Sequence, residues 1–548
     1  MRRTIAIAVA LAAAMLALAA AAGAGPPVTN QVASTPVLGG GYPVAPGATK
    51  PVPGTCGPQW LNSNHSESWL AVRPGTEDLV GASKFFVGKW STFYDFHLGS
   101  YTMPGGTPAA NNQVQGYDCT TVGTQEMPPS WTNDTDPNAD FDTQGRVYQA
   151  TLPFNAYWDG GMHPNGAIAV SYSDDLGRHW VTANGGRYLD QLSNSLSTTW
   201  GHVDDKQWIA VNHVTLSPWR DHVYAMWTTF NGSAGNSKIM VAVSRDRGQT
   251  FSKPVQLSTP SAATPANTYV YPSIDAGGTV YVAFVSGYDL KSKNRVGSLY
   301  VTRSSDDGRT FAPFTRAASP VENPVGALQN TTFRDGIIES FAASPAYPGH
   351  AYLTYEDYDA GAGTMNVYFT QSIDGGFTWS APALVNDDAG TAASDQFQPS
   401  VAAGSGGAVA VAFYDRRAAC PGDPSVLPAD AGRSNFCIAV SLQAYLDSGA
   451  GAVAVGGNVS LSKYAWDPEQ PGQKVDGLSQ YPCAGHSDPC PAGRGFIGDY
   501  FGLAISASSV YTLSVSTHYP SSVTADGGGP VYYQQQVLAT VSRGALGI

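Results

Sequence analysis

Residues able to do acid–base or anion-binding chemistry are few in this chain, and they recur at the ends of its apolar segments. Charged residues make up 13% of the 548 residues, with 29 Lys and Arg against 42 Asp and Glu. Many of them stand where an apolar segment begins or ends. Those before an apolar segment are Asp136, Asp204, Asp205, Lys206, Tyr271, Arg334, Asp335, Gln398, Asp499 and Tyr500, those after one are Glu356, Asp357, Asp415, Arg416 and Arg417, and Arg494 precedes the last segment.

These residue types suit the binding and cleavage of a polar ligand. Carboxyl groups donate and accept protons, arginines bind carboxylates bidentately, and a tyrosine beside a base can act as a nucleophile. Mixed charges that converge on one concavity indicate a polar ligand pocket. The alternative is that the Asp-Pro and Asp-Lys steps cap turns and form structural salt bridges.

Other chemistry-bearing patterns are weak. No Gly-x-Ser-x-Gly, His-Glu-x-x-His or P-loop phrase occurs, and we expect no cofactor. Asp134, Asp136, Asp140 and Asp142 form a local acidic cluster that is a candidate for structural calcium, and the alternative is a solvated loop. The net charge of −13 and the lack of a basic run argue against a nucleic-acid partner.

An eight-residue phrase, Ser-x-Asp-x-Gly-x-x-(Trp/Phe), occurs four times and indicates the elements that must position these residues. Each copy follows one short apolar segment and precedes another. It therefore predicts a hairpin turn, in which the Asp accepts backbone N–H bonds and the Gly takes a positive φ. These roles are structural, and one carboxylate per repeat is too few for a calcium cage. The four aspartates are Asp175, Asp246, Asp306 and Asp374.

The phrase belongs to a longer repeated unit. Four units contain it, in 134–185, 204–257, 269–315 and 334–384, and three lack it, in 66–107, 395–443 and 498–543. A four-stranded unit cannot bury both faces alone, whereas radial stacking can. We predict an all-β β-propeller of four-stranded blades, with seven blades preferred and six the alternative. The last unit ends after its third strand, so we expect a fourth strand from residues 28–60.

The N-terminal residues predict export. Residues 1–24 have two arginines, a long apolar run and a small-residue cleavage site, which are features of a signal peptide. Residues 25–57 are a Pro/Gly-rich leader, and residues 58–548 are interpreted as a single propeller domain. No later stretch is long enough for a membrane span. We expect a secreted, extracellular protein that is a monomer.

Six cysteines in an exported chain suggest disulfides. Cys420 and Cys437 flank one loop, and Cys483 and Cys490 flank another. This leaves Cys56 with Cys119, a pair that would fix the N-terminal segment.

The repeated phrase identifies the chain as similar to Asp-box, or BNR-repeat, propellers, whose best-known enzymes are sialidases. In such a propeller the Asp-box turns lie on the face opposite the ligand. The resemblance implies a triad of Arg334, Arg416 or Arg417, and Arg494 for a substrate carboxylate. It implies Tyr500 as nucleophile, Glu339 or Glu356 as its partner and Asp205 as the acid. The remaining candidates for substrate binding are Lys206, Asp335, Asp415 and Asp499.

Two classes of function follow. The first is a secreted sialidase-like glycosidase acting on a glycan or polysaccharide. The second is a carbohydrate- or protein-binding propeller without catalysis. The second stays open because sialidases have six blades rather than seven, and because their early Phe-Arg-Ile-Pro phrase is absent here.

Overall fold

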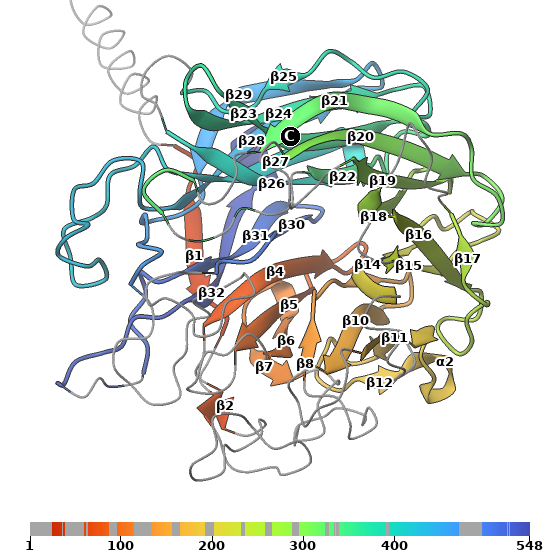
Figure 1. The fold of residues 1–548 in the computed structure, drawn as a ribbon, viewed down its shortest axis with the longest axis horizontal. Helices are drawn as coiled ribbons and strands as arrows, with labels where there is room; N and C mark the ends of the chain where they lie inside the picture. Colours follow the sequence, from red (N-terminus) through yellow and green to blue (C-terminus); the bar gives the residue numbers. More distant parts are fainter. Residues whose placement is uncertain are drawn as a thin grey trace, which may run out of the picture.

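The computed structural model is a ring of small antiparallel sheets around a central axis (Figure 1). It describes residues 25–34, 37–38, 60–61, 64–86, 96–113, 133–155, 165–191, 202–231, 236–257, 266–287, 295–323, 328–331, 333, 335, 339–388, 394–470, 496–522, 524 and 527–548. The seven sheets are the seven blades of a β-propeller, so the prediction of the all-β fold and of its blade number is confirmed.

Each of the first four blades is built in chain order from the centre outward. Blade 1 consists of β4 (His65–Val72), β5 (Leu79–Phe86), β6 (Phe96–Met103) and β7 (Ala110–Gln113). Blade 2 consists of β8 (Asn133–Thr135), β9 (Asp140–Phe141), β10 (Val147–Asn155), β11 (Asn165–Ser173), β12 (Val181–Thr182) and β13 (Asp190–Gln191). Blade 3 consists of β14 (His202–Val211), β15 (Val223–Asn231), β16 (Asn236–Ser244) and β17 (Val255–Gln256). Blade 4 consists of β18 (Asn267–Ile274), β19 (Val280–Ser286), β20 (Arg295–Ser304) and β21 (Thr315–Asn323).

The last three blades complete the ring. Blade 5 consists of β22 (Glu339–Ala343), β23 (Ala351–Asp359), β24 (Thr364–Ser372) and β25 (Ala383–Leu384). Blade 6 consists of β26 (Gln396–Ala403), β27 (Ala408–Asp415), β28 (Ala439–Asp447) and β29 (Ala452–Ser460). Blade 7 consists of β30 (Gly502–Ile505), β31 (Ser509–Ser516), β32 (Gln535–Ser542) and β1 (Val28–Val32). A separate ribbon joins β2 (Val37–Leu38) to β3 (Trp60–Leu61), and the short helices are η1 (Pro104–Gly106), α2 (Ala183–Gly186), η3 (Ser405–Gly407) and α3 (Arg543–Leu546).

Blade 7 takes its outer strand from the N-terminal segment. Strand β1 pairs antiparallel with β32, from Val28 opposite Val541 to Val32 opposite Val537. The amide of Asn30 also donates to the carbonyl of Leu461 at 2.8 Å, which links this strand to blade 6. The two ends of the described chain therefore meet in one sheet, which closes the ring and leaves no gap between the first and last blades.

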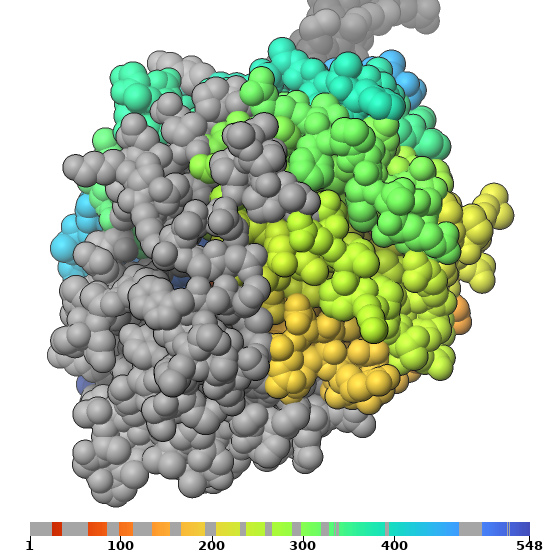
Figure 2. All heavy atoms as spheres, turned by 45° about the vertical axis from the view of Figure 1, so that its right-hand side comes forward, coloured from red at the N-terminus to blue at the C-terminus, as the bar shows by residue number. Residues whose placement is uncertain are grey.

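The core lies between neighbouring blades. Central strands such as β19 and β27 are buried along their whole length, because each blade covers both faces of the next. The large buried side chains include Trp180, Trp227 and Trp466. Blades 2 to 5 follow one another up the visible face in Figure 2, coloured from yellow-orange to cyan. Apolar burial between blades therefore supplies the framework on which the polar residues stand.

The turns formed by the four Ser-x-Asp-x-Gly phrases follow the third strand of blades 2 to 5. In the turn of blade 4, the Oγ of Ser304 donates to Asp306 at 2.8 Å, and the backbone N–H of Thr310 donates to the same carboxylate at 2.9 Å. Gly308 has a φ of 72° and donates its N–H to Ser304. The same contacts recur around Asp175, Asp246 and Asp374. These carboxylates therefore hold turns together, as their spacing predicts.

Cys420 and Cys437 form a disulfide that closes a loop of blade 6. Cys56, Cys119, Cys483 and Cys490 lie outside the described residues. The described part of the chain contains no helix that is long and apolar enough to cross a membrane.

Candidate functional site

A β-bulge at the start of the innermost strand brings polar side chains toward the centre of the ring, the region that is called the channel from this point on. The residues with positive φ at this place are Glu67, Asp136, Lys206, Tyr269 and Gln398, with φ between 44° and 56°. The register shifts between strands one and two at the same point in blades 1, 3, 4 and 6. A positive φ is unfavourable for any residue with a Cβ, and such strain concentrates at functional sites.

Lys206 lies at the centre of this ring of bulges. Its Nζ is 3.3 Å from Asp136, 3.4 Å from Asp499 and 3.9 Å from Asp205, and 5.6 Å from the ring of Tyr269. Blades 2, 3, 4 and 7 and the segments entering them therefore meet at one ammonium group. Burial opposes the charge of Lys206, but the three carboxylates raise its pKa well above the ordinary value.

Glu67 and Lys84 form a second ion pair beside the first. Their charged atoms are 2.6 Å apart and both side chains are buried. Burial raises the pKa of Glu67 to about 7, although Lys84 acts in the other direction. Burial also opposes the ionisation of Asp136, but Lys206 and Lys84 lower its pKa below the ordinary value. The channel therefore holds neighbouring carboxyl groups whose pKa values are shifted in opposite directions.

Asp335 and Glu356 form a pair of carboxyl groups in contact. Burial raises the pKa of Asp335 to about 7, and that of Glu356 well above its ordinary value, and the two side chains are hydrogen-bonded to each other. Glu356 also accepts the backbone N–H of Gln398 at 2.6 Å. Two carboxyl groups in contact share a proton, because both cannot ionise at low cost.

Asp205 differs from the other carboxyl groups because it reaches solvent. Its side chain is 33% exposed, whereas Asp136 and Asp499 are almost fully buried. The surrounding residues desolvate it in part and raise its pKa, the ammonium of Lys206 acts in the opposite direction, and the charge of Asp136 and a hydrogen bond with it add to the rise. Asp205 is thus a carboxyl group with an affinity for protons at the solvent-facing end of the site.

Glu339 is the first residue of β22 and is buried. Burial raises its pKa well above the ordinary value, and its charge acts on Tyr271 and Glu356 across the channel. Among the described residues, neither oxygen of its carboxyl group has a hydrogen-bond partner.

Tyr500 lies at the channel but packs as an aromatic core residue. Its ring centroid is 5.1 Å from that of Trp208 and 6.2 Å from that of Trp69. Its hydroxyl donates to the carbonyl of Pro137 at 2.9 Å. Burial and nearby carboxylates raise its pKa well above the ordinary value. A peptide carbonyl does not remove a proton, so this arrangement does not activate Tyr500 as a nucleophile.

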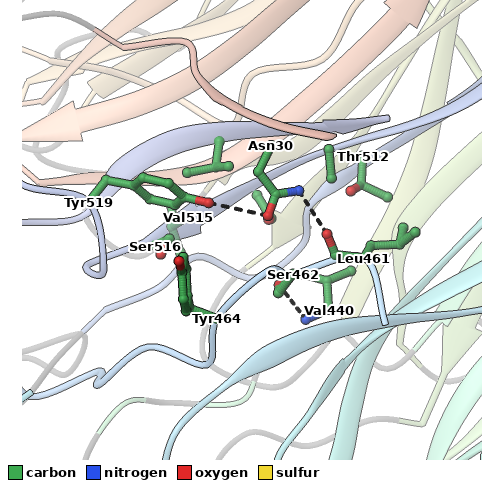
Figure 3. A pocket seen from close by; sticks show the side chains of 12 residues that line it. Asn30, Val440, Leu461, Ser462, Tyr464, Thr512, Val515, Ser516 and Tyr519 are labelled. Carbon is green, nitrogen blue, oxygen red and sulfur yellow. Dashed lines mark hydrogen bonds between the residues drawn. The ribbon is translucent and has the colours of Figure 1, made fainter. Parts of the chain in front are cut away.

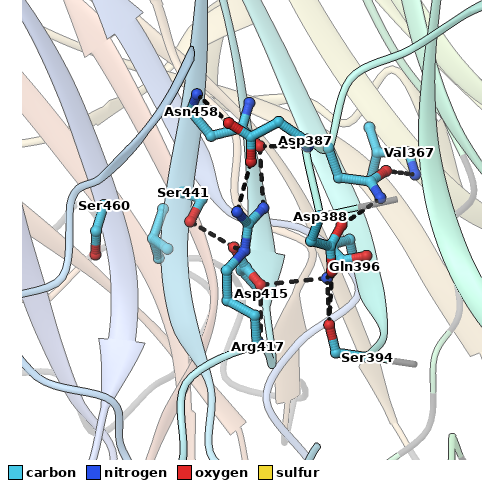
Figure 4. A network of polar contacts seen from close by, with 12 residues as sticks. Val367, Asp387, Asp388, Ser394, Gln396, Asp415, Arg417, Ser441, Asn458 and Ser460 are labelled. Carbon is cyan, nitrogen blue, oxygen red and sulfur yellow. Dashed lines mark hydrogen bonds and ion pairs between the residues drawn. The ribbon is translucent and has the colours of Figure 1, made fainter. Parts of the chain in front are cut away.

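The two described arginines of the implied triad, Arg416 and Arg417, bind partners outside the channel cluster. Arg416 is fully buried, with bonds of 2.8 Å to Asp395 and 2.7 Å to the carbonyl of Gln329, and burial lowers its pKa to about 10. Arg417 pairs with Asp415 at 2.7 Å and Asp387 at 2.5 Å, between blades 5 and 6 (Figure 4). Arg334 and Arg494 lie outside the described residues.

Asp415 belongs to this structural network rather than to the channel. Its carboxylate accepts the hydroxyl of Ser441 at 2.6 Å and lies 3.3 Å from the amide of Gln396. The residues that the structure does gather around the channel are called here the channel cluster, and they are Glu67, Lys84, Asp136, Asp205, Lys206, Asp335, Glu339, Glu356 and Asp499.

Three residues at this place, Glu67, Lys84 and Tyr269, were not predicted from the sequence. A signal for Glu67 exists. The segment Glu67-Ser68-Trp69 occupies the place in blade 1 that Lys206-Gln207-Trp208 occupies in blade 3, with the same register shift before the tryptophan. The blade 1 unit lacks a complete Asp-box, which hid this correspondence.

The acidic residues considered as calcium ligands contact separate partners rather than one another. Asp136 faces Lys206, Asp140 contacts His213 at 3.0 Å, and Asp142 contacts Arg247 at 2.7 Å. Within the described ranges, no group of three or more His, Cys, Asp or Glu side chains is arranged to hold a metal ion.

A concavity lies between blades 6 and 7 (Figure 3). It is lined by Asn30, Tyr464, Thr512 and Tyr519 among others, and the Tyr519 hydroxyl donates to Asn30 at 3.2 Å. Its lining contains no carboxyl group, so it lacks the acid–base chemistry of the channel cluster.

The fold and site together define a seven-bladed β-propeller with a cluster of mostly buried carboxyl groups near its centre. No family model matches the chain, and no curated protein matches it. Solved structures with a similar arrangement include a Hadza microbial sialidase, at 14% identity over 82% of this chain and 74% of that one, with a TM-score of 0.38. They also include the α-L-arabinofuranosidase Arb93A of Fusarium graminearum, at 12% identity over 75% and 94% with a TM-score of 0.38.

A third similar structure is the polysaccharide lyase Uly1, at 8% identity over 95% of this chain and 100% of that one, with a TM-score of 0.44. Similarities at this level do not establish the activity of this chain.

Proposed function

We propose that this propeller is a glycoside hydrolase that acts on a glycan at the channel cluster. The observation that carries the proposal is that neighbouring carboxyl groups have pKa values shifted in opposite directions. Asp205 has a raised pKa and reaches solvent, while Asp136 beside it has a lowered pKa. Glycoside hydrolysis uses one carboxylic acid to protonate the leaving oxygen and one carboxylate to stabilise or attack the sugar.

In this proposal Asp205 donates the proton to the leaving group. The ionised partner is Asp136, whose pKa Lys206 lowers, and Asp499 lies 3.4 Å from the same ammonium group. The Asp335–Glu356 pair lies behind them and can accept or return a proton near neutral pH. The proposal does not extend to sialic acid, because Arg416 is engaged with main-chain carbonyls and Tyr500 is not activated.

The proposal includes export, which the signal-like N-terminus and the Cys420–Cys437 disulfide support, and it includes a monomeric state. The test is to screen the purified mature protein against aryl glycosides and a panel of polysaccharides. Release of reducing ends from at least one neutral or charged glycan supports it, and no release from any of them contradicts it.

A second candidate is a glycan-binding propeller without catalysis. The burial of seven of the nine members of the channel cluster favours it, since Lys206 exposes only 13% of its side chain and Asp205 exposes a third. In that case, calorimetry would show binding of a glycan that the protein does not cleave.

A further inference from the structure

The concavity between blades 6 and 7 has a buried floor and a partly exposed rim (Figure 3). Apolar side chains form most of the floor, among them Val440, Leu461 and Val515, each at most 1% exposed. The rim includes Tyr464, which is 39% exposed although its ring is large and apolar. An apolar floor with a few polar groups around it is the usual composition of a site for a small ligand.

One polar group of the floor, the hydroxyl of Thr512, is available to a ligand. Thr512 is fully buried, and its hydroxyl has no hydrogen-bond partner among the described residues. The space inside the concavity is about the size of one water molecule, so a single hydroxyl group can enter it and a whole sugar ring cannot. A buried hydroxyl without a partner is costly, so a ligand hydroxyl that reached Thr512 would stabilise the site.

Tyr464 gives the rim a fixed aromatic surface. Its ring stacks on that of His518, with the centroids 3.9 Å apart and the planes 21° from parallel. The Nδ1 of His518 lies 2.8 Å from the Oγ of Ser425, which holds the imidazole in place. Burial lowers the pKa of His518 and Lys463 adds to this, while Asp423 acts in the opposite direction, so the imidazole is neutral at pH 7. A ring held in this way loses little freedom when a ligand binds.

Asn30, from the strand β1 that closes the ring, ties the two sides of the rim together. Its Oδ1 accepts the backbone N–H of Lys463 at 2.7 Å and the hydroxyl of Tyr519 at 3.2 Å. Its Nδ2 donates to the carbonyl of Leu461 at 2.8 Å. The segment that carries Tyr464 is therefore held at a set distance from Tyr519 before any ligand arrives, which lowers the entropic cost of binding.

We propose that this concavity is a glycan-binding site that takes one neutral pyranose residue of an oligosaccharide. A pyranose ring has an apolar face of C–H groups and an edge of hydroxyl groups. The face lies on Tyr464, and one hydroxyl enters the concavity and bonds to Thr512. The nearby charged side chains, Lys463 and Asp423, have opposite signs and favour neither an anionic nor a cationic sugar. No lining residue belongs to the channel cluster, so the proposal does not depend on hydrolysis there.

The experiment is titration calorimetry with cellohexaose, mannohexaose, xylohexaose and the hexamer of galacturonic acid. All proteins carry Asp205→Asn, so that cleavage at the channel cluster does not consume the probes. We expect at least one neutral probe to bind and Tyr464→Ala to weaken this binding about tenfold. Phe377→Ala, which removes another exposed aromatic ring, should change it by less than about twofold. No binding of any neutral probe, equal effects of the two variants, or tighter binding of the acidic hexamer would overturn the proposal.

A second variant tests the floor of the site. Thr512→Val keeps the shape of the side chain and replaces its hydroxyl with a methyl group. We expect the variant to bind the same probe about fivefold more weakly, while its unfolding midpoint stays unchanged or rises, because a hydroxyl without a partner is removed. Unchanged binding, or weaker binding together with a lower midpoint, would overturn the assignment of Thr512 to the ligand.

The outcomes also separate this site from the proposed function. Binding that depends on Tyr464, with no cleavage of any glycan by the native protein, would leave the site standing and would contradict a hydrolase. Cleavage of a glycan by the native protein, with binding that Tyr464→Ala leaves unchanged, would support the hydrolase and overturn the site.

Discussion

Replacing Lys206 with methionine should reverse the way in which the ionisation of Asp136 makes the stability of the fold depend on pH. In the native protein, Nζ of Lys206 lies within 3.4 Å of both Asp136 and Asp499, whose side chains are 5% and 2% exposed. Methionine fills a similar volume but leaves these two carboxylates without their cation. Removing one partner of a buried ion pair costs about 3–5 kcal/mol, because an uncompensated charge stays buried.

The sign of the pH dependence follows from the pKa of Asp136. Burial opposes the ionisation of Asp136, but Lys206 and Lys84 hold its pKa in the folded state below its pKa in the unfolded state. Asp136 therefore stabilises the native fold at pH values above its unfolded-state pKa, and this stabilisation is lost in acid. Without Lys206, burial dominates and the folded pKa exceeds the unfolded one. The variant therefore regains stability as the pH falls from 7 toward 5, when Asp136 takes up a proton.

The assay is chemical unfolding of wild type and Lys206→Met at pH 7 and pH 5, with Lys463→Met as an exposed control. We expect a loss of about 3–5 kcal/mol at pH 7, a smaller loss at pH 5, and a change below about 0.5 kcal/mol for the control. A loss below about 1 kcal/mol at pH 7, or one that does not shrink at pH 5, would refute this account of the channel.

Three further predictions concern the rest of the molecule. Because the pKa values of Glu67 and Asp335 are raised, the folded state binds more protons than the unfolded state between about pH 4.5 and 7. The wild type should therefore unfold at a higher denaturant concentration at pH 5.5 than at pH 8. The reverse order would contradict the burial of these two carboxyl groups. Asp306→Ala removes the acceptor of the Thr310 backbone and hydroxyl bonds and should cost about 1–2 kcal/mol in an unfolding titration, without changing glycan cleavage. Replacing Cys420 and Cys437 by serine opens a loop of 17 residues and should cost about 2–4 kcal/mol, and an unchanged unfolding midpoint would show that the loop is held by its other contacts.

Much of the architecture could be predicted because repetition is visible in the sequence. The four Asp-boxes mark blades 2 to 5, and once their spacing was known, degenerate units such as 66–107 could be counted as well. Strand propensity and turn chemistry act locally, so they are readable from a few neighbouring residues.

The channel cluster was predicted only in part, since its assembly depends on contacts between distant residues. Asp205, Lys206 and Asp499 were found because they precede the innermost strands. Glu67 was missed because a bulge with positive φ is not encoded by any strong local preference of glutamate.

For Arg416 the sequence indicated a binding role that its contacts in the structure do not support. Arg416 stands beside Asp415 and a strand end, which in sequence suits an anion-binding fork. The structure instead surrounds it with main-chain carbonyls of residues 329, 435 and 436. Position relative to a strand therefore located the residue, but not the direction of its side chain or the partners it would find.

The central claim is that Asp205 donates a proton to the leaving group of a glycoside. The most direct measurement is kcat/KM of wild type and Asp205→Asn on a glycan and on the matching 2,4-dinitrophenyl glycoside, whose leaving group departs without protonation. We expect Asp205→Asn to lose about 10²–10⁴-fold on the glycan and far less on the dinitrophenyl substrate. An equal loss on both substrates, or no loss on either, would contradict the claim.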